Sequence, residues 1–389
     1  MKLVNIIKTS ILGAALVAFA GCNDAEYGDI TNSVYISEAA PSGAFRQQVE
    51  NLTIDGGLQT AIHVRLAQTV DYDVNVTIDY APEFTEEYNT ANGTEYLVLP
   101  AEYLSFDKKA VIKAGNISSD NINIDIAQYP TDTGAAYCVP LKIVTCDAPF
   151  AVSEKSSRIL YLLASPHKQV VPIMNTNTRP AGGSSDASDP AAWGITTSEW
   201  TLEGWIWMSA FPINNQAIFN GQVSSGTEIY IRFGDANVPY DILQIKTTGS
   251  QVETNTKFEP MTWYHLAFVY SHGSLTIYIN GEADVQGDFA DVEFVINGLE
   301  LCSSGSYFRA NARMAQVRFW SKALSQNTIK DAMNRQVPAN SEGLFGYWKL
   351  DEGEGSVYYD ATGNGRDLKC AVTPSWTSDV VNFSNPNNQ

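Results

Sequence analysis

Apolar and polar residues alternate with a period of two along much of this chain. The segments at 62–66, 74–78 and 122–126 each place apolar side chains on one face and polar side chains on the other, which is typical of half-buried β-strands. Turn-forming residues separate these segments, and helical signals are limited to a turn or two at Glu83–Asn92 and a short helix at Gln326–Asn334. The pattern therefore predicts an all-β protein.

The same pattern divides the chain into two domains. About seven short strands within residues 28–165 predict an immunoglobulin-like β-sandwich. Ser165–Lys168 is expected to be a joint, and strands resume over 169–385, where the Gly- and Ser-rich segment Arg179–Pro190 is expected to be a loop. A mature chain of roughly 365 residues also fits two domains of ordinary size.

The N-terminus has the features of an export signal. Lys2 and Lys8 precede an apolar run at 11–20, which is too short to span a bilayer. The run ends in Phe19-Ala20-Gly21-Cys22, which resembles a lipobox, although Phe19 stands where that pattern usually has Leu. An ordinary signal peptide followed by a chance cysteine is the alternative.

This signal gives the expected location of the protein. The lipobox implies a signal peptide at 1–21, acylation of Cys22 and a lipid-anchored tether at 22–27, and several acyl chains give stable anchoring. The acidic segment Asn23–Glu26 resembles the surface-export signal of lipoproteins in gut glycan-harvesting bacteria. We expect an outer-membrane protein that faces the cell surface and meets the membrane through its lipid only. The residues alone leave the inner leaflet, the periplasm and the surface open.

The charge of the chain excludes some partners. The formal net charge is −19, whereas nucleic acid and anionic lipid both require a basic face. We therefore expect no nucleic-acid partner.

The first domain resembles a known family. The segments EEYNTANGTEY at 86–96, Leu99-Pro100 and IKAG at 112–115 are similar to the N-terminal module of surface lipoproteins from glycan-utilisation loci. That module also precedes family-18 endoglycosidase domains, and its own function is uncharacterised. The resemblance implies a cellular context more than a chemistry.

The second domain carries a more specific resemblance. The segments are WTLEGWI at 200–206, WYHLAFVY at 263–270, LTIYING at 275–281, AQVRFW at 315–320 with Ala323-Leu324, and GYWKLDEG at 346–353. In this order they resemble a laminin-G-like, concanavalin A-like jelly roll. The resemblance implies two curved antiparallel sheets, a concave face, and binding of carbohydrate or protein.

Strand parity separates an apolar face from a mixed face in several strands of this domain. Leu202, Ile206 and Met208 share one face, which we expect to form the core between the sheets. The mixed faces offer rings that can stack on a sugar and charged groups that can bind its hydroxyls. The expected ligand-binding set is Glu203, Trp205, Trp207, Tyr230, Arg232, Tyr278 and Arg318.

These residues also have a structural interpretation. Trp205, Trp207 and Trp320 would then pack beneath covering loops as a second core layer, and the charged residues would pair with one another. The sequence leaves both interpretations open.

Laminin-G-like domains often carry Ca²⁺, which needs several oxygen ligands. The candidate metal ligands are Asp186 and Asp189 in the long loop, and Asp360 and Asn364 in the segment YDATGNG at 359–365. For the second pair, a turn capped by Asp is the alternative.

The sequence carries no familiar catalytic motif. It has no G-x-S-x-G, P-loop or H-E-x-x-H pattern. The segment DEGEG at 351–355 is acidic, and paired carboxylates serve glycoside hydrolysis. Its glycines indicate a turn, however, so we expect Glu352 and Glu354 to face solvent. The expected protein is not an enzyme.

Three functions follow, in decreasing order of support. The first is a surface lipoprotein that captures a glycan for a polysaccharide-utilisation system, in which an outer-membrane importer or a hydrolase of the same locus would be its partner. The second is an adhesion or scaffold protein that binds a protein partner. The third is a glycoside hydrolase. Fold-level resemblance is a weak basis for choosing among them.

Overall fold

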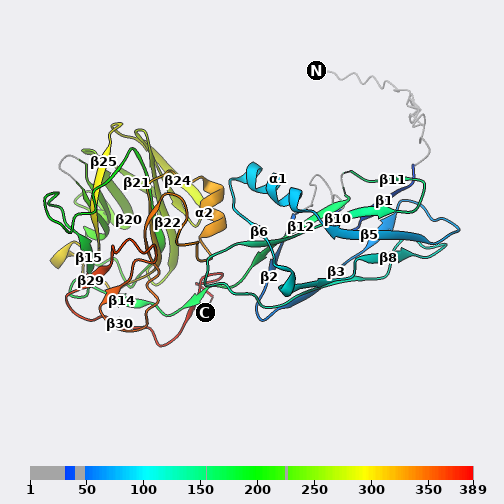
Figure 1. Cartoon of the computed structure of the whole chain (residues 1–389). Helices are drawn as coiled ribbons and strands as arrows, with labels where there is room; N and C mark the ends of the chain where they lie inside the picture. The colour runs from blue at the N-terminus through cyan, green and yellow to red at the C-terminus, as the bar shows by residue number, and fades with distance from the viewer. Residues whose placement is uncertain (1–30, 40–48, 155, 224–226, 389) are drawn as a thin grey trace, which may run out of the picture.

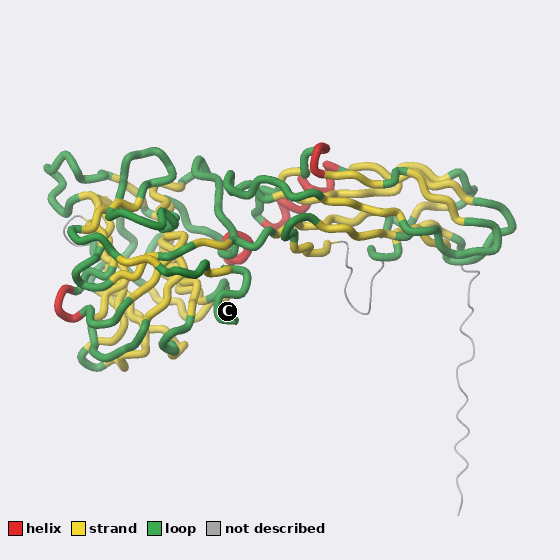
Figure 2. Tube along the Cα trace, turned by 90° about the horizontal axis from the view of Figure 1, so that it is seen from below, coloured by secondary structure: helices red, strands yellow, loops and turns green. Residues whose placement is uncertain are grey.

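The computed structural model describes residues 31–39, 49–154, 156–223 and 227–388. The expected signal peptide, tether and acylated Cys22 lie outside these residues. No helix within the described ranges is long and apolar enough to cross a membrane. Figures 1 and 2 show two bodies side by side, and the strands of the first domain run along its long axis.

Three sheets enclose one core in the first domain. Side chains from all three, among them Val34, Ile62 and Val139, meet in that core, which is the arrangement of a β-sandwich. One three-stranded sheet has the order β11 (Ala151–Val152), β1 (Ser33–Ile36), β4 (Val64–Leu66). The other three-stranded sheet has the order β3 (Leu58–Ile62), β9 (Ile122–Ile126), β7 (Leu104–Phe106). The six-stranded sheet is β2 (Val49–Thr53), β12 (Arg158–Ala164), β10 (Tyr137–Cys146), β5 (Val74–Tyr80), β8 (Lys109–Ile112), with β6 (Leu97–Val98) beside β10.

The helix α1 (Pro82–Asn92) is longer than the expected turn or two. Pro82 stands in the first turn, where a main-chain N–H would have no acceptor within the helix, so proline costs no hydrogen bond there. Gly93 ends the helix with a left-handed φ of 66°. Phe84 packs with Cys138 and Leu160, a cluster separate from the sandwich core. The helix therefore covers the outer face of the six-stranded sheet.

Two antiparallel sheets form the second domain. The eight-stranded sheet is β24 (Glu282–Asp288), β23 (Ser274–Ile279), β22 (Trp263–Ser271), β17 (Glu199–Met208), β26 (Ala312–Trp320), β14 (Pro172–Met174), β30 (Ser375–Trp376), with β27 (Leu344–Trp348) beside β26. The nine-stranded sheet is β21 (Ser250–Lys257), β20 (Val238–Thr247), β19 (Ile229–Asp235), β18 (Gln216–Val223), β25 (Phe294–Leu301), β15 (Pro180–Gly183), β29 (Leu368–Cys370), β28 (Val357–Tyr358), with β16 (Ile195–Thr197) beside β25. Separately, β13 (Lys168–Gln169) pairs with β31 (Val381–Asn382).

The core of the second domain lies between these sheets. Leu202 and Ile206 of β17 meet Ile229 and Ile231 of β19 in one buried cluster, as strand parity predicts. The all-β class and the concanavalin A-like jelly roll are therefore confirmed.

The segment expected to be a loop at Arg179–Pro190 begins with a strand. Gly182 and Gly183 belong to β15, which pairs with β25 and β29. A Cβ on Gly183 would lie 2.1 Å from the main-chain oxygen of Asn297. These glycines therefore mark a close approach of backbones rather than a turn.

The helix α2 (Gln326–Ala332) lies on the side of the second domain that faces the first domain (Figure 1). The hydroxyl of Thr328 donates to the main-chain oxygen of Gly93 at 3.2 Å, and Arg335 donates to that of Gly134 at 3.0 Å. The hydroxyl of Tyr96 donates to Asp331. Hydrogen bonds from α2 and the residues after it thus fasten the two domains together.

Substitution of Gly134 tests this docking. Its φ is +73°, and a Cβ there would lie 2.2 Å from the carbonyl carbon of Val337 in the other domain. Gly115 has a similar φ of +81° and nothing within 4 Å of a built Cβ. Both alanine variants carry the strain of a left-handed residue, about 1 kcal/mol, but only Gly134→Ala should separate the domains.

Small-angle scattering measures the separation directly. We expect a larger radius of gyration for Gly134→Ala and an unchanged one for Gly115→Ala. Equal compactness of the two variants would show that the contacts at Gly134 do not hold the domains together.

Candidate functional site

The expected ligand residues of β17 share the outer face of the eight-stranded sheet, as strand parity predicts. Across the sheet, Glu203 stands beside Arg318, and Trp207 stands beside Trp263 and Arg313. A second layer packs on this face around Glu203 and Trp205. This covering layer consists of α2, the segment 333–337 and residues 381–383.

Burial removes three residues from the expected ligand-binding set. Glu203, Trp205 and Arg318 are 0%, 4% and 0% exposed, respectively. The indole N–H of Trp205 donates at 2.6 Å to the main-chain oxygen of Met333, within the covering layer. These side chains contact the protein itself, so the interpretation as a second core layer applies to them.

Arg318 connects the sheet to the covering layer. Its guanidinium donates to the main-chain oxygen of Ala332, at 3.1 Å, and to that of Arg335 just beyond α2. It also lies 3.4 Å from a carboxylate oxygen of Glu203. The same oxygen accepts a 3.0 Å hydrogen bond from the indole of Trp320. Charges expected to bind a ligand instead hold the helix on the sheet.

Burial controls the protonation of this cluster. It raises the pKa of Glu203, against the opposing effect of Arg318. Burial, together with Arg318, lowers the pKa of His265 to about 3. His265 lies 3.6 Å from Glu203 and is neutral at ordinary pH, so Arg318 supplies the positive charge that faces the carboxylate.

The other expected ligand residues do not join one site. Tyr278 packs against the cluster beneath α2, whereas Tyr230 and Arg232 lie on β19 of the nine-stranded sheet. The Arg232 guanidinium donates to Gln244 at 2.7 and 3.0 Å and to Asn215 at 3.1 Å. Tyr230 donates to Asn215 at 3.0 Å. The hydrogen-bonding groups of Tyr230 and Arg232 are therefore largely satisfied within the protein.

An open groove remains where β17 ends, around half-buried Trp207. Its volume is about 740 Å³, and it includes the row of Trp263, Trp207 and Arg313 that three neighbouring strands place side by side. We call it the Trp207 groove. The further lining residues are Ile173, Met261, Trp376, Thr377, Ser378, Asp379, Val380, Val381, Pro386 and Asn387.

The C-terminal segment forms one wall of the Trp207 groove. The side-chain amide of Asn387 bonds both main-chain groups of Trp263, at 2.7 and 3.0 Å. Thr377 exchanges hydrogen bonds of 3.0 and 3.1 Å with the main chain of Val171. This wall is therefore fixed to the sheet at two points.

Arg313 is the unusual member of the groove. Its guanidinium carbon lies 4.3 Å from the ring centroid of Trp207. It forms no hydrogen bond or ion pair through its side chain with the described part of the chain, and its Nε is buried without an acceptor. The indole N–H of Trp376 is likewise buried without an acceptor. Both of these N–H groups are shielded from solvent, so the donors that a bound molecule could reach are the terminal nitrogens of Arg313.

The sequence did not identify Arg313, because its strand is irregular. Arg313 is five residues from Arg318, so a regular strand would place the two on opposite faces. Gln316 has a left-handed φ of 56°, and the pairing with β17 shifts register between Glu203 and Trp205. This bulge brings both arginines to the outer face.

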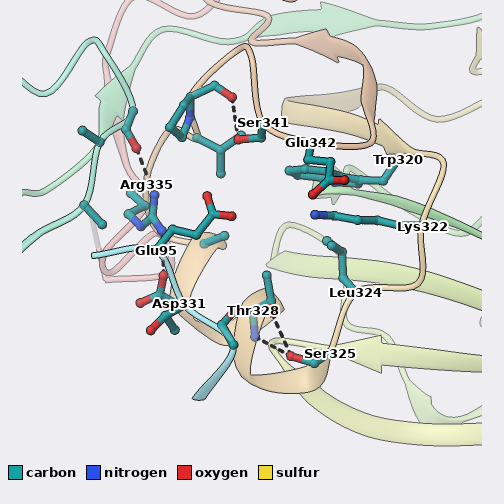
Figure 3. A pocket seen from close by; sticks show the side chains of 18 of the residues that line it. Glu95, Trp320, Lys322, Leu324, Ser325, Thr328, Asp331, Arg335, Ser341 and Glu342 are labelled. Carbon is teal, nitrogen blue, oxygen red and sulfur yellow. Dashed lines mark hydrogen bonds and ion pairs between the residues drawn. The ribbon is translucent and has the colours of Figure 1, made fainter. Parts of the chain in front are cut away.

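A second cavity lies between the two domains, with a volume of about 560 Å³. Figure 3 shows Glu95 of the first domain, and Lys322 and Glu342 of the second, around its interior. Its aromatic member, Trp320, is 4% exposed and has the Lys322 ammonium 5.5 Å from its ring. The interdomain cavity therefore offers charged groups but no open aromatic surface.

Comparison with known proteins agrees with the two-domain architecture. Residues 30–149 match a family model that describes an N-terminal domain, and residues 181–330 match the model of the concanavalin A-like lectin/glucanases superfamily. The second domain is a concanavalin A-like domain. None of the curated proteins matches the chain.

Several solved structures are similar to this chain, and the first described below shares its fold. A Bacteroides ovatus protein described as a "putative carbohydrate binding protein" is 22% identical, has a TM-score of 0.57, and is covered over 99% of its length by 91% of this chain. EndoBT-3987 of Bacteroides thetaiotamicron, solved with a Man5GlcNAc product, is 15% identical over 34% of this chain and 30% of its own, with a TM-score of 0.28. Domain 4 of AbnA, a Geobacillus stearothermophilus arabinanase solved with arabinotriose, is 13% identical over 42% of this chain and 98% of its own, with a TM-score of 0.29. Only the first similarity is close enough to compare folds.

The expected calcium ligands of the concanavalin A-like domain hold turns. One oxygen of Asp360 accepts from the main-chain N–H and the hydroxyl of Thr362, at 3.1 and 2.7 Å. Asp186 accepts from Ser188 and Asp189 from Ala191, two residues later in each case. Among the described residues, no group of three or more His, Cys, Asp or Glu side chains could hold a metal ion. These carboxylates cap their own turns, and calcium binding stays a prediction.

The side chain of Asn364 takes part in the same turn as Asp360. It donates at 2.8 Å to the hydroxyl of Thr362, which itself donates to Asp360. The capped turn considered as the alternative for this pair therefore describes the geometry.

The expectation that Glu352 and Glu354 both face solvent is wrong for Glu352. One of its oxygens accepts from the main-chain N–H of Tyr359 at 2.9 Å, and the other is buried. Burial raises the pKa of Glu352, whereas Glu354 is exposed. Glu352 therefore stabilises the turn between β27 and β28.

Replacement of Arg318 tests the attachment of the covering layer. Arg318→Met should lower the free energy of unfolding by about 3–5 kcal/mol, because it leaves the Glu203 carboxylate buried without its cation. The double variant with Glu203→Gln should lose less than the sum of the two single changes. Urea unfolding measures these differences, and strict additivity would contradict the pairing. Lys108→Met, which breaks an exposed pair with Asp79, is the control and should have little effect.

The depressed pKa of His265 predicts a pH dependence of stability. The unfolded chain protonates this histidine below about pH 6.5, whereas the folded protein keeps it neutral down to about pH 3. Stability is therefore lost as pH falls through this window, by up to about 1.4 kcal/mol per pH unit. His265→Asn should flatten the dependence.

Urea unfolding at pH 7, 6 and 5 provides the measurement. His63 is a control of opposite sign, because its hydrogen bond to Glu38 raises its pKa and its contribution is lost as pH rises. Parallel pH profiles for the wild type and His265→Asn would show that His265 is not held neutral.

Proposed function

We propose that this chain is a carbohydrate-binding protein, anchored to the outer membrane through acylated Cys22 and facing the cell surface. It would capture a glycan for an importer or a hydrolase of the same polysaccharide-utilisation system. The observation that carries the proposal is the Trp207 groove, where aromatic side chains and Arg313, whose side chain has no partner among the described residues, line one open cavity.

The chemistry of the groove suits a sugar. A pyranose presents apolar C–H faces and a rim of hydroxyls, so its site needs apolar surface and a few directed polar groups. Trp207, Trp376 and Met261 supply the first, and Arg313 and Asp379 supply the second. A volume of about 740 Å³ lies within the usual range for small-molecule sites.

The order of the domains suits capture at a surface. The expected anchor precedes the first domain, so that the sandwich stands between the lipid and the concanavalin A-like domain in the chain. The interdomain hydrogen bonds of Tyr96 and Thr328 would make the sandwich a rigid spacer. The groove would then be held away from the membrane.

Loss of Trp207 tests the proposal. We expect Trp207→Ala in the soluble chain that starts after Cys22 to bind its glycan about 5- to 150-fold more weakly, since stacking of a ring on an aromatic side chain contributes about 1–3 kcal/mol. Affinity electrophoresis and a broad glycan array measure the binding, and thermal unfolding checks that the variant is folded.

Tyr240→Ala is the matched control. Tyr240 is 48% exposed on β20 of the opposite sheet, so its loss should leave binding unchanged. Retention by no glycan of the array would refute carbohydrate binding. Capture of an outer-membrane protein instead would favour the adhesion function.

A further inference from the structure

Arg313 is half-buried and, unlike the buried Arg318 on the same sheet face, has no internal acceptor. Arg318 reaches Glu203 and two main-chain oxygens. Arg313 reaches none among the described residues, although the chain has 43 acidic residues and only 24 basic ones. In so acidic a protein, a guanidinium without a carboxylate calls for an explanation.

The position of Arg313 is fixed by its surroundings. Its strand pairs it with Trp207 on one side and Ile173 on the other. The guanidinium is stacked on the Trp207 ring at 4.3 Å, and Nε is buried. The Arg313 guanidinium is therefore a planar donor that is already held in position at the wall of the Trp207 groove.

The environment of Arg313 favours an anion. Burial lowers its pKa, which means that the charge is partly removed from water without an internal counter-charge. An anionic acceptor would restore the lost solvation through paired, charge-assisted hydrogen bonds.

Asp379 is the acidic residue of the same groove. Its main-chain oxygen accepts from Thr377, and its carboxylate pairs with no described residue, Arg313 included. Asp379 could accept sugar hydroxyls but would repel a second carboxylate. Within the groove, a carboxylate of the ligand is therefore expected to bind beside Arg313 and away from Asp379.

We propose that the Trp207 groove binds a glycan through a sugar that carries a carboxylate, such as a uronic acid, and that Arg313 recognises this carboxylate. The inference rests on the proposed carbohydrate binding and names its ligand class. The net charge of −19 repels acidic glycans at long range, but salt screens that repulsion beyond about 8–10 Å. The contact with Arg313 therefore decides the preference.

Matched acidic and neutral oligosaccharides test the inference. The probes are oligogalacturonides and hyaluronan oligosaccharides, each beside its carboxyl-reduced form, in which the carboxylate becomes a neutral CH₂OH with the same ring geometry. Titration calorimetry with the soluble chain measures each affinity. We expect at least one acidic probe to bind about 10- to 100-fold more tightly than its reduced form, as for a hydrogen bond to a charged group.

Two variants locate the preference. Arg313→Gln should reduce the ratio of acidic to reduced affinity to about one while the reduced form still binds. Arg179→Gln removes one positive charge from a 45% exposed side chain that directly precedes β15 of the other sheet and pairs with Glu300, and it should leave the ratio unchanged.

The outcomes separate this inference from the proposed function. Equal binding of acidic and reduced forms, binding of neutral array glycans but of no acidic probe, or a preference that survives Arg313→Gln would overturn the role of Arg313 and leave carbohydrate binding intact. Binding of no carbohydrate at all would overturn both.

Discussion

The arrangement of the second domain depends on one buried contact, that of Arg318 with Glu203 and with the main chain at the end of α2. Both side chains are fully buried, and a buried charge is tolerated only with a close partner and satisfied hydrogen bonds. Arg318 has such a partner in Glu203, and its terminal nitrogens donate to the main chain at and beyond the end of α2, although its Nε has no acceptor among the described residues. Because α2 also carries Asp331, which accepts from Tyr96, the same helix holds the first domain.

This contact also determines where the domain can bind a ligand. The covering layer occupies the outer face around Glu203 and Trp205 and leaves the end of β17 open at Trp207. Arg313 and Arg318 project from the same face of the same strand. Arg318 donates to the covering helix, whereas Arg313 faces an open groove. Similar side chains thus have different roles because only one is covered.

The sequence predicted the sandwich, the jelly roll and the alternation of faces, because each depends on local periodicity and motif order. Parity correctly placed Glu203, Trp205 and Trp207 together. It could not show that the covering layer lies over the first two, since the contact of Trp205 with Met333 joins residues more than a hundred positions apart. It also missed Arg313, because a single left-handed residue, Gln316, changes the phase of the strand. Burial excluded residues that the sequence suggested as ligand-binding, and the bulge at Gln316 added Arg313, which the sequence did not suggest.

The central claim is that the covering layer leaves the Trp207 groove as the glycan site of this protein. A crystal structure of the soluble chain with a bound oligosaccharide tests it most directly. The account predicts a sugar between Trp207 and the segment 377–380, with an oxygen of the sugar within hydrogen-bond distance of Arg313. A sugar bound instead against Tyr230 and Arg232, or in the cavity between the domains, would contradict it.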